Sequence, residues 1–471
     1  MPTASTNNKA AQVADIEFVL VECARAQKLL SDTPPTEWKD LPRDELIGSL
    51  PHPSGSGDMS CSREAERRIW GLAEQAVKQS DAVGTLETER VYRALKPILV
   101  DRFVKEARTI DAQQVERALA AAARQAKRDR SDTIHFIPCR LMYASDPDSF
   151  AIGPVTFMTR SRFNESMAPH FEAYVRKEPL GIELREGLLA DARHYYEDFT
   201  WVARVQVLNC DAGTSKTRAN IAVTAALNFL HAFFGAYHTR RMNVAGPRLE
   251  RDRRARFTLD ADNMLDVSCS SSATSAVGFT DGWGAFLEGE TMALLLRGSA
   301  KALESLVNPA IQRPLGMRLV DSAAWFGDAV REPSPAAQIV KAVTALEALV
   351  MTGEHDDIIS LLSARSAAIA YHPIGEKTFT SLEEELREAY DMRSRLTHGS
   401  LSPFDPEVEA YAAVCLHLGE QVICAGLELF ESQGLIDTPR TTKELGRAFD
   451  QLVVWVKAHS AARASPGTDV L

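Results

Sequence analysis

The sequence predicts an α+β multidomain protein that is mostly α-helical, with a helical segment near the N-terminus, an α+β region and a C-terminal up-and-down helical bundle. Three observations support this prediction. The 471 residues exceed the size at which one hydrophobic core stops growing, so two or three domains are expected. Apolar residues recur at helical spacing on both sides of the middle region. Within that region, short β-branched and aromatic runs are separated by turn residues.

Residues 1–58 are expected to be largely disordered. They are rich in Pro, Ser, Gly and Thr, as in "SDTPPTEW" and "LPHPSGSGDMS", and have room for at most one helix, near Ile16 to Leu30. The opening "MPTASTNNKAAQVADIEF" lacks the basic stretch and apolar run of a secretion signal. Residues 59–130 are predicted to be helical, because "EAERRIWGLAEQAVKQ" and "VERALAAAARQAKRDR" place charged residues opposite apolar ones.

Residues 131–312 are predicted to form the α+β region. "TIHFIPCRLMY", "FAIGPVTFMT" and "WVARVQVL" are typical of strands, and "ETMALLL" is a further candidate strand. The apolar run Ile221–Tyr237 is shorter than the roughly 20 residues that a bilayer requires. It is also interrupted by Asn228 and His231. We therefore expect a buried helix here and no membrane partner.

The strongest basic concentration is the segment Arg240–Arg256, "RRMNVAGPRLERDRRAR". Its arginines are Arg240, Arg241, Arg248, Arg251, Arg253, Arg254 and Arg256. Two interpretations remain open, a solvated charged face and a surface that binds RNA phosphates. The chain as a whole has a net charge of -11, so a polyanion partner would need such a local basic patch.

Residues 313–435 are predicted to form the C-terminal bundle, followed by a helix and tail over residues 436–471. Short connections between long amphipathic helices are typical of up-and-down bundles. The third helix ends at Gly399, a residue type that commonly follows the last helical turn. The four helices are predicted to start at Ser334–Pro335, near Ile358, at a capping box formed by Thr380 and Glu383, and at Asp405–Pro406.

Three ionisable side chains of this bundle lie on or beside apolar stripes. Arg393 continues the apolar stripe of the third helix, so it occupies a core or interface position. Arg365 is surrounded by apolar positions on the second helix, and Glu347 borders the stripe of the first. Because an unpaired buried charge costs several kcal/mol, we expect Glu347 and Arg365 to pair with each other, with a catalytic role as the alternative.

His398 stands in the last turn of the third helix, directly before Gly399. The simplest interpretation is a C-terminal cap that interacts favourably with the helix dipole. Five residues on a regular helix are about 140° apart, so the side chains of Arg393 and His398 point in different directions. They converge only if the last turn is distorted or if a symmetry mate completes the site.

The stretches "AWFGDAVREPSPAAQIVKAVTALEALV", "LLSARSAAIAY" and "EAYDMRSRLTHGS" together resemble the ApeA-like branch of the HEPN superfamily. The defining pattern of that superfamily is Arg, four to six residues, then His, which here is Arg393, four residues, His398. The resemblance covers about a quarter of the chain. Many nuclease members carry Asn, Asp or His directly after the arginine, whereas this chain has Ser394, a residue familiar in the ApeA-like branch. Glu347, Arg365, Tyr390 and Ser394 match accompanying positions of the family and are expected to support the site.

The resemblance implies a metal-independent endoribonuclease that needs no cofactor and forms a homodimer through its C-terminal bundle. Its partner would be RNA, such as tRNA, and its setting bacterial phage defence or toxin-like RNA cleavage. Arg393 and His398 would be the catalytic residues, since arginine binds phosphate oxygens and histidine exchanges protons near neutral pH. The products implied are a 2′,3′-cyclic phosphate and a 5′-hydroxyl.

Two other functions remain open. A HEPN module without catalytic activity could bind a nucleotide or RNA, and a purely structural module could act as a dimeric helical adaptor. A spatial route from the segment Arg240–Arg256 to His398 favours the enzyme. Seven cysteines, an odd number with no CxxC motif, are typical of reduced thiols and predict a cytoplasmic location.

Overall fold

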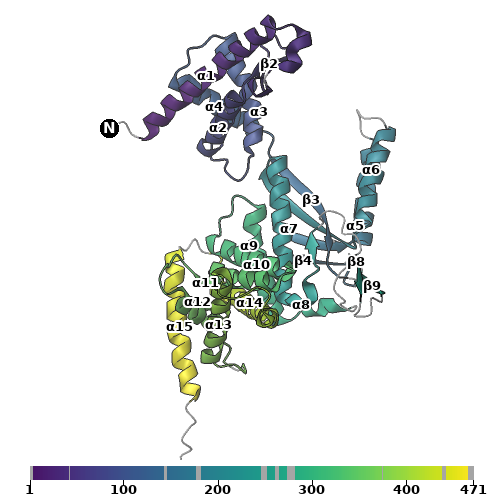
Figure 1. Cartoon of the computed structure of the whole chain (residues 1–471), viewed down its shortest axis with the longest axis vertical. Coiled ribbons are helices and arrows are strands. Elements are labelled where there is room, and N and C mark those ends of the chain that lie inside the picture. Colours follow the sequence, from purple (N-terminus) through teal and green to yellow (C-terminus); the bar gives the residue numbers. More distant parts are fainter. Residues whose placement is uncertain are drawn as a thin grey trace, which may run out of the picture. The chain divides into compact units, whose positions relative to one another are not determined.

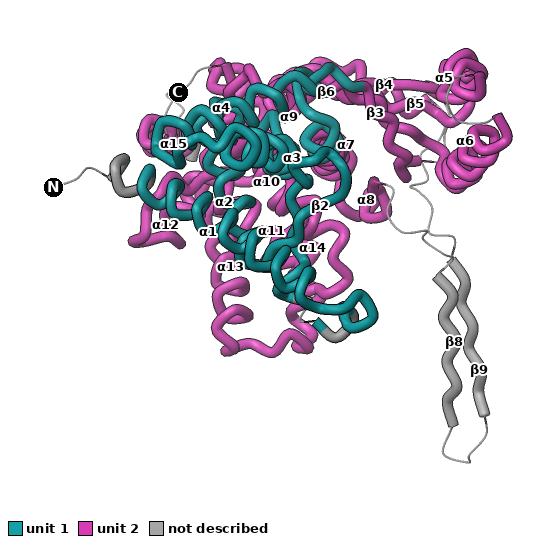
Figure 2. Tube along the Cα trace, turned by 90° about the horizontal axis from the view of Figure 1, so that it is seen from above, with its two compact units in different colours: residues 1–133, 207–217 teal, residues 134–206, 218–471 magenta. Residues whose placement is uncertain are grey.

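The computed structural model of the chain describes residues 4–41, 43–142, 146–176, 182–244, 252–259, 265–272, 282–373, 375–437 and 442–464. The protein is mostly helical with small sheets, as the sequence predicts (Figure 1). The chain divides into two compact units, which Figure 2 colours separately. The first unit comprises residues 1–133 and 207–217, and the second comprises residues 134–206 and 218–471.

The N-terminal unit is a cluster of helices around one β-hairpin. Two of its helices begin at side-chain caps, since the Ser62 hydroxyl accepts from the Ala65 amide and the Asp111 carboxylate from the Gln114 amide. The elements are α1 (Ala4–Asp32), β1 (Gly48–Pro51), β2 (Asp58–Cys61), α2 (Arg63–Gln79), α3 (Thr88–Leu99), a π-helical turn (Val100–Lys105) and α4 (Ala112–Lys127). The apolar faces of these helices meet in one core.

Residues 1–58 were expected to be largely disordered, and here the structure differs. Helix α1 is 29 residues long. Its side chains Ile16, Val19, Cys23 and Ala26 are buried, and the first three belong to the same core as Leu50 of the hairpin. The reason is their spacing of three or four residues, which aligns them in a narrow apolar stripe. The polar composition of the segment conceals this stripe.

A five-stranded sheet in the order β4-β5-β6-β3-β7 lies mostly in the second unit. The strand pairs β4–β5, β5–β6 and β3–β7 are antiparallel. The strands are β3 (Ser131–Arg140), β4 (Ser149–Ile152), β5 (Val155–Thr159), β6 (Trp201–Cys210) and β7 (Asn243–Val244). The three predicted strand segments are thus confirmed. A separate antiparallel pair consists of β8 (Asp252–Leu259) and β9 (Leu265–Ser272).

Aromatic side chains hold the sheet in place. Phe150 stacks on Phe157 with ring centroids 5.1 Å apart, and both Phe150 and Trp201 contact Trp283 edge-on. Another cluster joins Met158 and Val202 of the sheet to Phe163, with side chains of α5 (Arg160–Val175) and α6 (Ile182–Tyr196) packed against it. The sheet therefore packs against helices through large apolar side chains.

The predicted buried helix is confirmed as α7 (Ala212–Phe234), which ends where Gly235 adopts a φ of 85° and is followed by α8 (Ala236–Thr239). Asn228 and His231, which interrupt its apolar run, are buried in a polar network. The Arg331 guanidinium donates to the Asn228 amide oxygen and to His231 Nε2, both at 2.9 Å. His231 Nδ1 lies 2.9 Å from the Thr239 hydroxyl. Burial and the nearby Arg331 lower the pKa of His231 to about 3, so it is a neutral structural residue.

The remaining helices form the C-terminal bundle. They are α9 (Glu290–Val307), α10 (Pro314–Arg331), α11 (Pro335–Val350), α12 (Ile358–Ala370), α13 (Phe379–Thr397), α14 (Pro406–Ser432) and α15 (Thr442–Ala464). Helix α11 packs against α10, α13 and α14, whereas α12 packs against α13, α14 and α15. Helix α14 is long and apolar enough to cross a membrane, but core helices of soluble proteins pass the same test.

Two local predictions for this region are wrong. The segment "ETMALLL" begins helix α9 and is not a strand, because Leu295, Ala302 and Leu306 continue an apolar face at helical spacing. The N-cap of α13 is Thr378, whose hydroxyl accepts from the Ser381 amide at 3.1 Å, and not Thr380. The predicted starts at Ser334–Pro335 and Asp405–Pro406 are confirmed, and the Asp405 carboxylate accepts from the Glu407 amide.

Candidate functional site

Arg393 of α13 forms an ion pair with Glu347 of α11. The Arg393 Nη2 atom lies 3.3 Å from Glu347 Oε2, and both side chains are about three-quarters buried, with 24% and 22% of their surface exposed. Burial raises the pKa of the Glu347 carboxyl, and the Arg393 charge opposes that shift. This geometry corrects the sequence-based expectation that Glu347 pairs with Arg365.

The Arg393 guanidinium retains hydrogen-bonding capacity. Its Nε is buried and has no hydrogen-bond partner among the described residues. Its central carbon lies 5.7 Å from the centre of the Tyr390 ring, one turn earlier on the same helix. A buried N–H without an acceptor is costly, so an incoming anion that accepted from it would regain that free energy.

His398 is the residue at which α13 ends. Its backbone amide donates to the Ser394 carbonyl at 2.9 Å, and Gly399 follows with a φ of 74°. The His398 side chain is exposed, and within the described part of the chain no side-chain hydrogen bond or ion pair of this imidazole is found. The position at a helix end is therefore as predicted. The imidazole is accessible for proton exchange with a ligand.

Among the described residues, no hydrogen bond or ion pair joins the side chains of Arg393 and His398. Helix α13 stays α-helical from Phe379 to Thr397, so the last turn before His398 keeps the divergence expected for a spacing of five residues. The Thr397 hydroxyl also donates to the Arg393 carbonyl at 3.0 Å, which is compatible with an unbroken helix. A distorted last turn, one of the two ways in which the side chains of Arg393 and His398 could converge, is therefore not observed.

A surface pocket lies beside the end of α13. It has a volume of about 420 Å³ and is lined by residues of α10, α11 and α13, with Leu396 and Thr397 next to His398 in the chain. The Trp325 side chain at this pocket is 44% exposed, and Phe404, one residue beyond the lining residue Pro403, is 93% exposed. Apolar surface is therefore concentrated near the residues that the sequence singles out.

Arg365 pairs with two other carboxylates. Its Nη2 lies 2.8 Å from Glu354 in the α11–α12 connection and 2.9 Å from Asp450 of α15. Its Nη1 donates to the Val350 carbonyl at the end of α11 at 3.0 Å. Periodicity places Arg365 on an inward face but does not specify which neighbouring helix supplies its partner. The structure thus gives Arg365 a role in joining α11, α12 and α15.

The hydrogen bond from Arg365 affects the pKa of Glu354. Burial acts to raise its pKa, but hydrogen bonds from Arg365 and from Thr352 outweigh that effect and lower the pKa to about 2. Glu354 is therefore an ionised partner of a buried arginine at neutral pH. Such an arrangement is typical of a structural ion pair.

The basic segment falls largely outside the described residues. Arg240 and Arg241 are exposed in the connection between α8 and β7. Arg248 and Arg251 lie outside the described residues, and the side chains of Arg253, Arg254 and Arg256 on β8 are likewise outside the description. A route from this segment to His398 remains a prediction.

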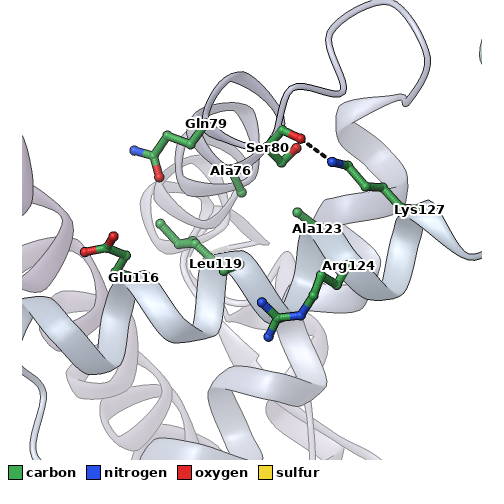
Figure 3. A pocket seen from close by; sticks show the side chains of 9 residues that line it. Ala76, Gln79, Ser80, Glu116, Leu119, Ala123, Arg124 and Lys127 are labelled. Carbon is green, nitrogen blue, oxygen red and sulfur yellow. Dashed lines mark hydrogen bonds between the residues drawn. The ribbon is translucent and has the colours of Figure 1, made fainter.

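Another pocket, of about 270 Å³, lies between α2 and α4 in the N-terminal unit (Figure 3). Its basic residues are Arg124 and Lys127, and the Lys127 ammonium donates to the Ser80 carbonyl. Glu116 at its edge is paired with Lys9 at 2.7 Å. Two of its charged groups thus already have partners, and no motif in the sequence points to this pocket.

Comparisons with known proteins do not assign a family. Among the described residues, no group of three or more His, Cys, Asp or Glu side chains is placed to hold a metal ion. A scan against protein-family models finds no match, and searches of the curated proteins and of the solved structures find no match either.

Proposed function

We propose that this protein is a metal-independent endoribonuclease of HEPN type. The observation that carries the proposal is the placement of Arg393 and His398 on one helix. Arg393 is held by Glu347 and keeps a buried N–H donor without an acceptor, and the imidazole of His398 is exposed where the helix ends. A cation with spare donors and an accessible imidazole are the two groups that metal-free RNA cleavage requires.

The chemistry follows from these two groups. His398 takes the proton from a ribose 2′-hydroxyl, and the resulting oxygen attacks the adjacent phosphorus. The bond from phosphorus to the 5′-oxygen breaks, and that oxygen receives a proton from a second acid. The His398 imidazole of a second copy of this chain is suited to that role. Arg393 stabilises the extra negative charge on the phosphate oxygens. The products are a 2′,3′-cyclic phosphate and a 5′-hydroxyl.

A homodimer through the C-terminal bundle accounts for the divergence of Arg393 and His398. Two copies that face each other would place each arginine near the histidine of the other copy. The exposed Trp325 and Phe404 side chains near the end of α13 support a contact surface in this region. RNA would then bind in the groove that both copies line, in a phage-defence or toxin-like setting.

One observation favours a second function. Glu347 already neutralises Arg393 at 3.3 Å, so an anion must compete with a carboxylate for the guanidinium. A module that keeps this ion pair as part of its interface, with Ser394 in place of the residue that many nucleases carry, would bind a nucleotide or RNA without cleaving it. The same fold would also serve as a dimeric helical adaptor.

Cleavage assays with single variants distinguish these functions. The parent protein is incubated with total tRNA and with a defined single strand in EDTA, and the fragment ends are analysed. We expect cyclic phosphate ends from the parent and no cleavage by His398→Ala. His372→Ala, which removes another exposed histidine of the same bundle, is the matched control and should cleave like the parent.

Arg393→Ala should abolish cleavage and Arg393→Lys should reduce it, because lysine keeps the charge but loses the forked geometry. If the parent cuts neither substrate but binds RNA with an affinity that Arg393→Ala lowers, the non-catalytic module is the better account. If the parent neither cuts nor binds RNA, the dimeric helical adaptor is the better account. Cleavage by His398→Ala at the parent rate would exclude the catalytic role of this residue.

A further inference from the structure

A tight turn directly before α14 holds one aromatic side chain out in solvent. Ser402 to Asp405 form a β-turn, in which the Asp405 amide donates to the Ser402 carbonyl at 3.1 Å. Pro403 takes the second position of the turn, which its fixed φ suits, and Phe404 the third. The Ser402 hydroxyl accepts from the Phe404 amide at 3.2 Å. The backbone of Phe404 is thus fixed, although its side chain is 93% exposed.

An apolar pocket opens beside this turn. It is the pocket of about 420 Å³ between α10, α11 and the end of α13, and Pro403 is one of its lining residues. Trp325, Val340 and Leu396 supply apolar walls. The volume is sufficient for an aromatic ring. The Phe404 ring of the same chain does not enter the pocket, since it is almost fully exposed and is not among the lining residues.

The charge distribution at this pocket suits a second copy of the chain. The chain has a net charge of -11, so two copies repel each other on average. Lys341 is the only ionisable side chain among the nine lining residues, and its ammonium is neutralised by Glu332 at 2.6 Å. The pocket itself therefore presents no unpaired charge to an approaching copy.

A projecting ring and a recess lie side by side in one surface patch. In a two-fold symmetric dimer the same patch of both copies meets, so a self-complementary patch must contain both the projecting group and the recess that receives it. Phe404 and the pocket beside Trp325 meet that condition. A small ligand would fill the recess and leave Phe404 exposed, whereas a second copy buries both.

We propose that Phe404 of each copy inserts into the pocket beside Trp325 of a second copy, so that two identical contacts close a symmetric dimer. Thr397 lines this pocket and directly precedes His398 in the chain. The inserted turn of the second copy therefore lies beside the end of α13. This inference rests on the homodimer of the proposed function and names the residues that would form its interface.

Sedimentation velocity of the full chain over a concentration series tests the proposal. Phe404→Ala should raise the dissociation constant of the dimer at least about 10-fold, because a buried aromatic anchor is lost. Phe404→Glu should remain monomeric, because it would bring a charge into an apolar pocket. Both variants should melt like the parent, since the Phe404 ring makes few contacts in its own subunit.

Trp455→Ala is the matched control, since Trp455 is an aromatic side chain of α15 that is 53% exposed and does not line the pocket. It should dimerise like the parent. A parent that stays monomeric throughout the series would overturn the proposal, as would Phe404→Ala that dimerises like the parent. An equal loss of association in Trp455→Ala would overturn the assignment to this pocket.

The insertion of Phe404 has its own readout. Phe404→Cys is mixed with Ala337→Cys, a substitution in the pocket lining, and the mixture is oxidised and digested for mass spectrometry. We expect a disulfide between position 404 of one copy and position 337 of the other. Val454→Cys, at a position of α15 that is 70% exposed, replaces Ala337→Cys as the control and should form no such link. Equal linkage to position 454, or linkage between two copies of position 404 alone, would overturn the insertion.

The failure of this interface and the failure of the ribonuclease give different results. Neither association nor disulfide formation requires RNA. A dimer that Phe404→Ala dissociates but that cuts no RNA would refute the ribonuclease and support the interface.

Discussion

Replacing Arg365 by methionine tests whether this buried arginine joins three parts of the bundle. Arg365→Met keeps most of the side-chain volume but removes the guanidinium that contacts Glu354, Asp450 and the Val350 carbonyl. The buried carbonyl loses its donor, which costs about 1 to 3 kcal/mol. The two carboxylates contribute less, because their side chains are 27% and 58% exposed and water takes over part of the lost interaction.

The expected net loss is about 2 to 4 kcal/mol in the free energy of unfolding of the second unit. For a unit of this size that corresponds to a fall in melting temperature of roughly 3 to 6 °C, measurable by scanning calorimetry. Arg387→Met is the matched control, since Arg387 is an exposed arginine of the same bundle with a carboxylate at 3.8 Å. Its effect should stay within about 0.5 kcal/mol.

The ion pair between Arg365 and Glu354 also predicts how stability depends on pH. The folded-state pKa of Glu354 is about 2 against an ordinary 4.5, so its contribution to stability is present above pH 4.5 and is lost as pH falls towards 2. The shift corresponds to at most about 3 kcal/mol, of which about 1 to 2 remain after solvent screening. Arg365→Met should lose less stability than the parent over this window. A variant that melts within a degree of the parent, or that shows the parent's acid dependence unchanged, would refute the reasoning.

The remaining predictions concern the site, the assembly and one close contact. His398→Ala should unfold within about 1 kcal/mol of the parent, since a residue at the helix end contributes little through the dipole, and a larger change in thermal melting would contradict its accessible position. Light scattering at micromolar concentration should give the mass of a homodimer, and a monomer mass with an intact circular dichroism spectrum would count against the proposed assembly. Gly327→Ala should destabilise by about 1 to 3 kcal/mol in thermal melting, because its Cβ would lie 2.0 Å from the buried Asn228 amide oxygen, and unchanged stability would mean that this contact can relax.

The sequence by itself determined the helical character of most elements and several of their ends. Pro335 and Asp405 mark helix starts, and Gly399 follows the end of α13, because capping and backbone conformation depend on a few neighbouring residues. It also identified Arg393 and Arg365 as charges on inward faces, since helical periodicity is a local property. The ApeA-like HEPN resemblance stays a prediction, because no comparison tests it.

Only the tertiary structure decided which groups meet. Glu347 pairs with Arg393 and Arg365 with Asp450, which follows it by 85 residues, because the relative rotation and shift of packed helices come from the fit of many side chains. The same holds for Cys23 and Cys61, which lie far apart in the sequence and belong to one buried core in the fold. Helical periodicity predicts that a side chain points inward. The group that the side chain contacts belongs to another element, and the position of that element depends on the packing of the whole core.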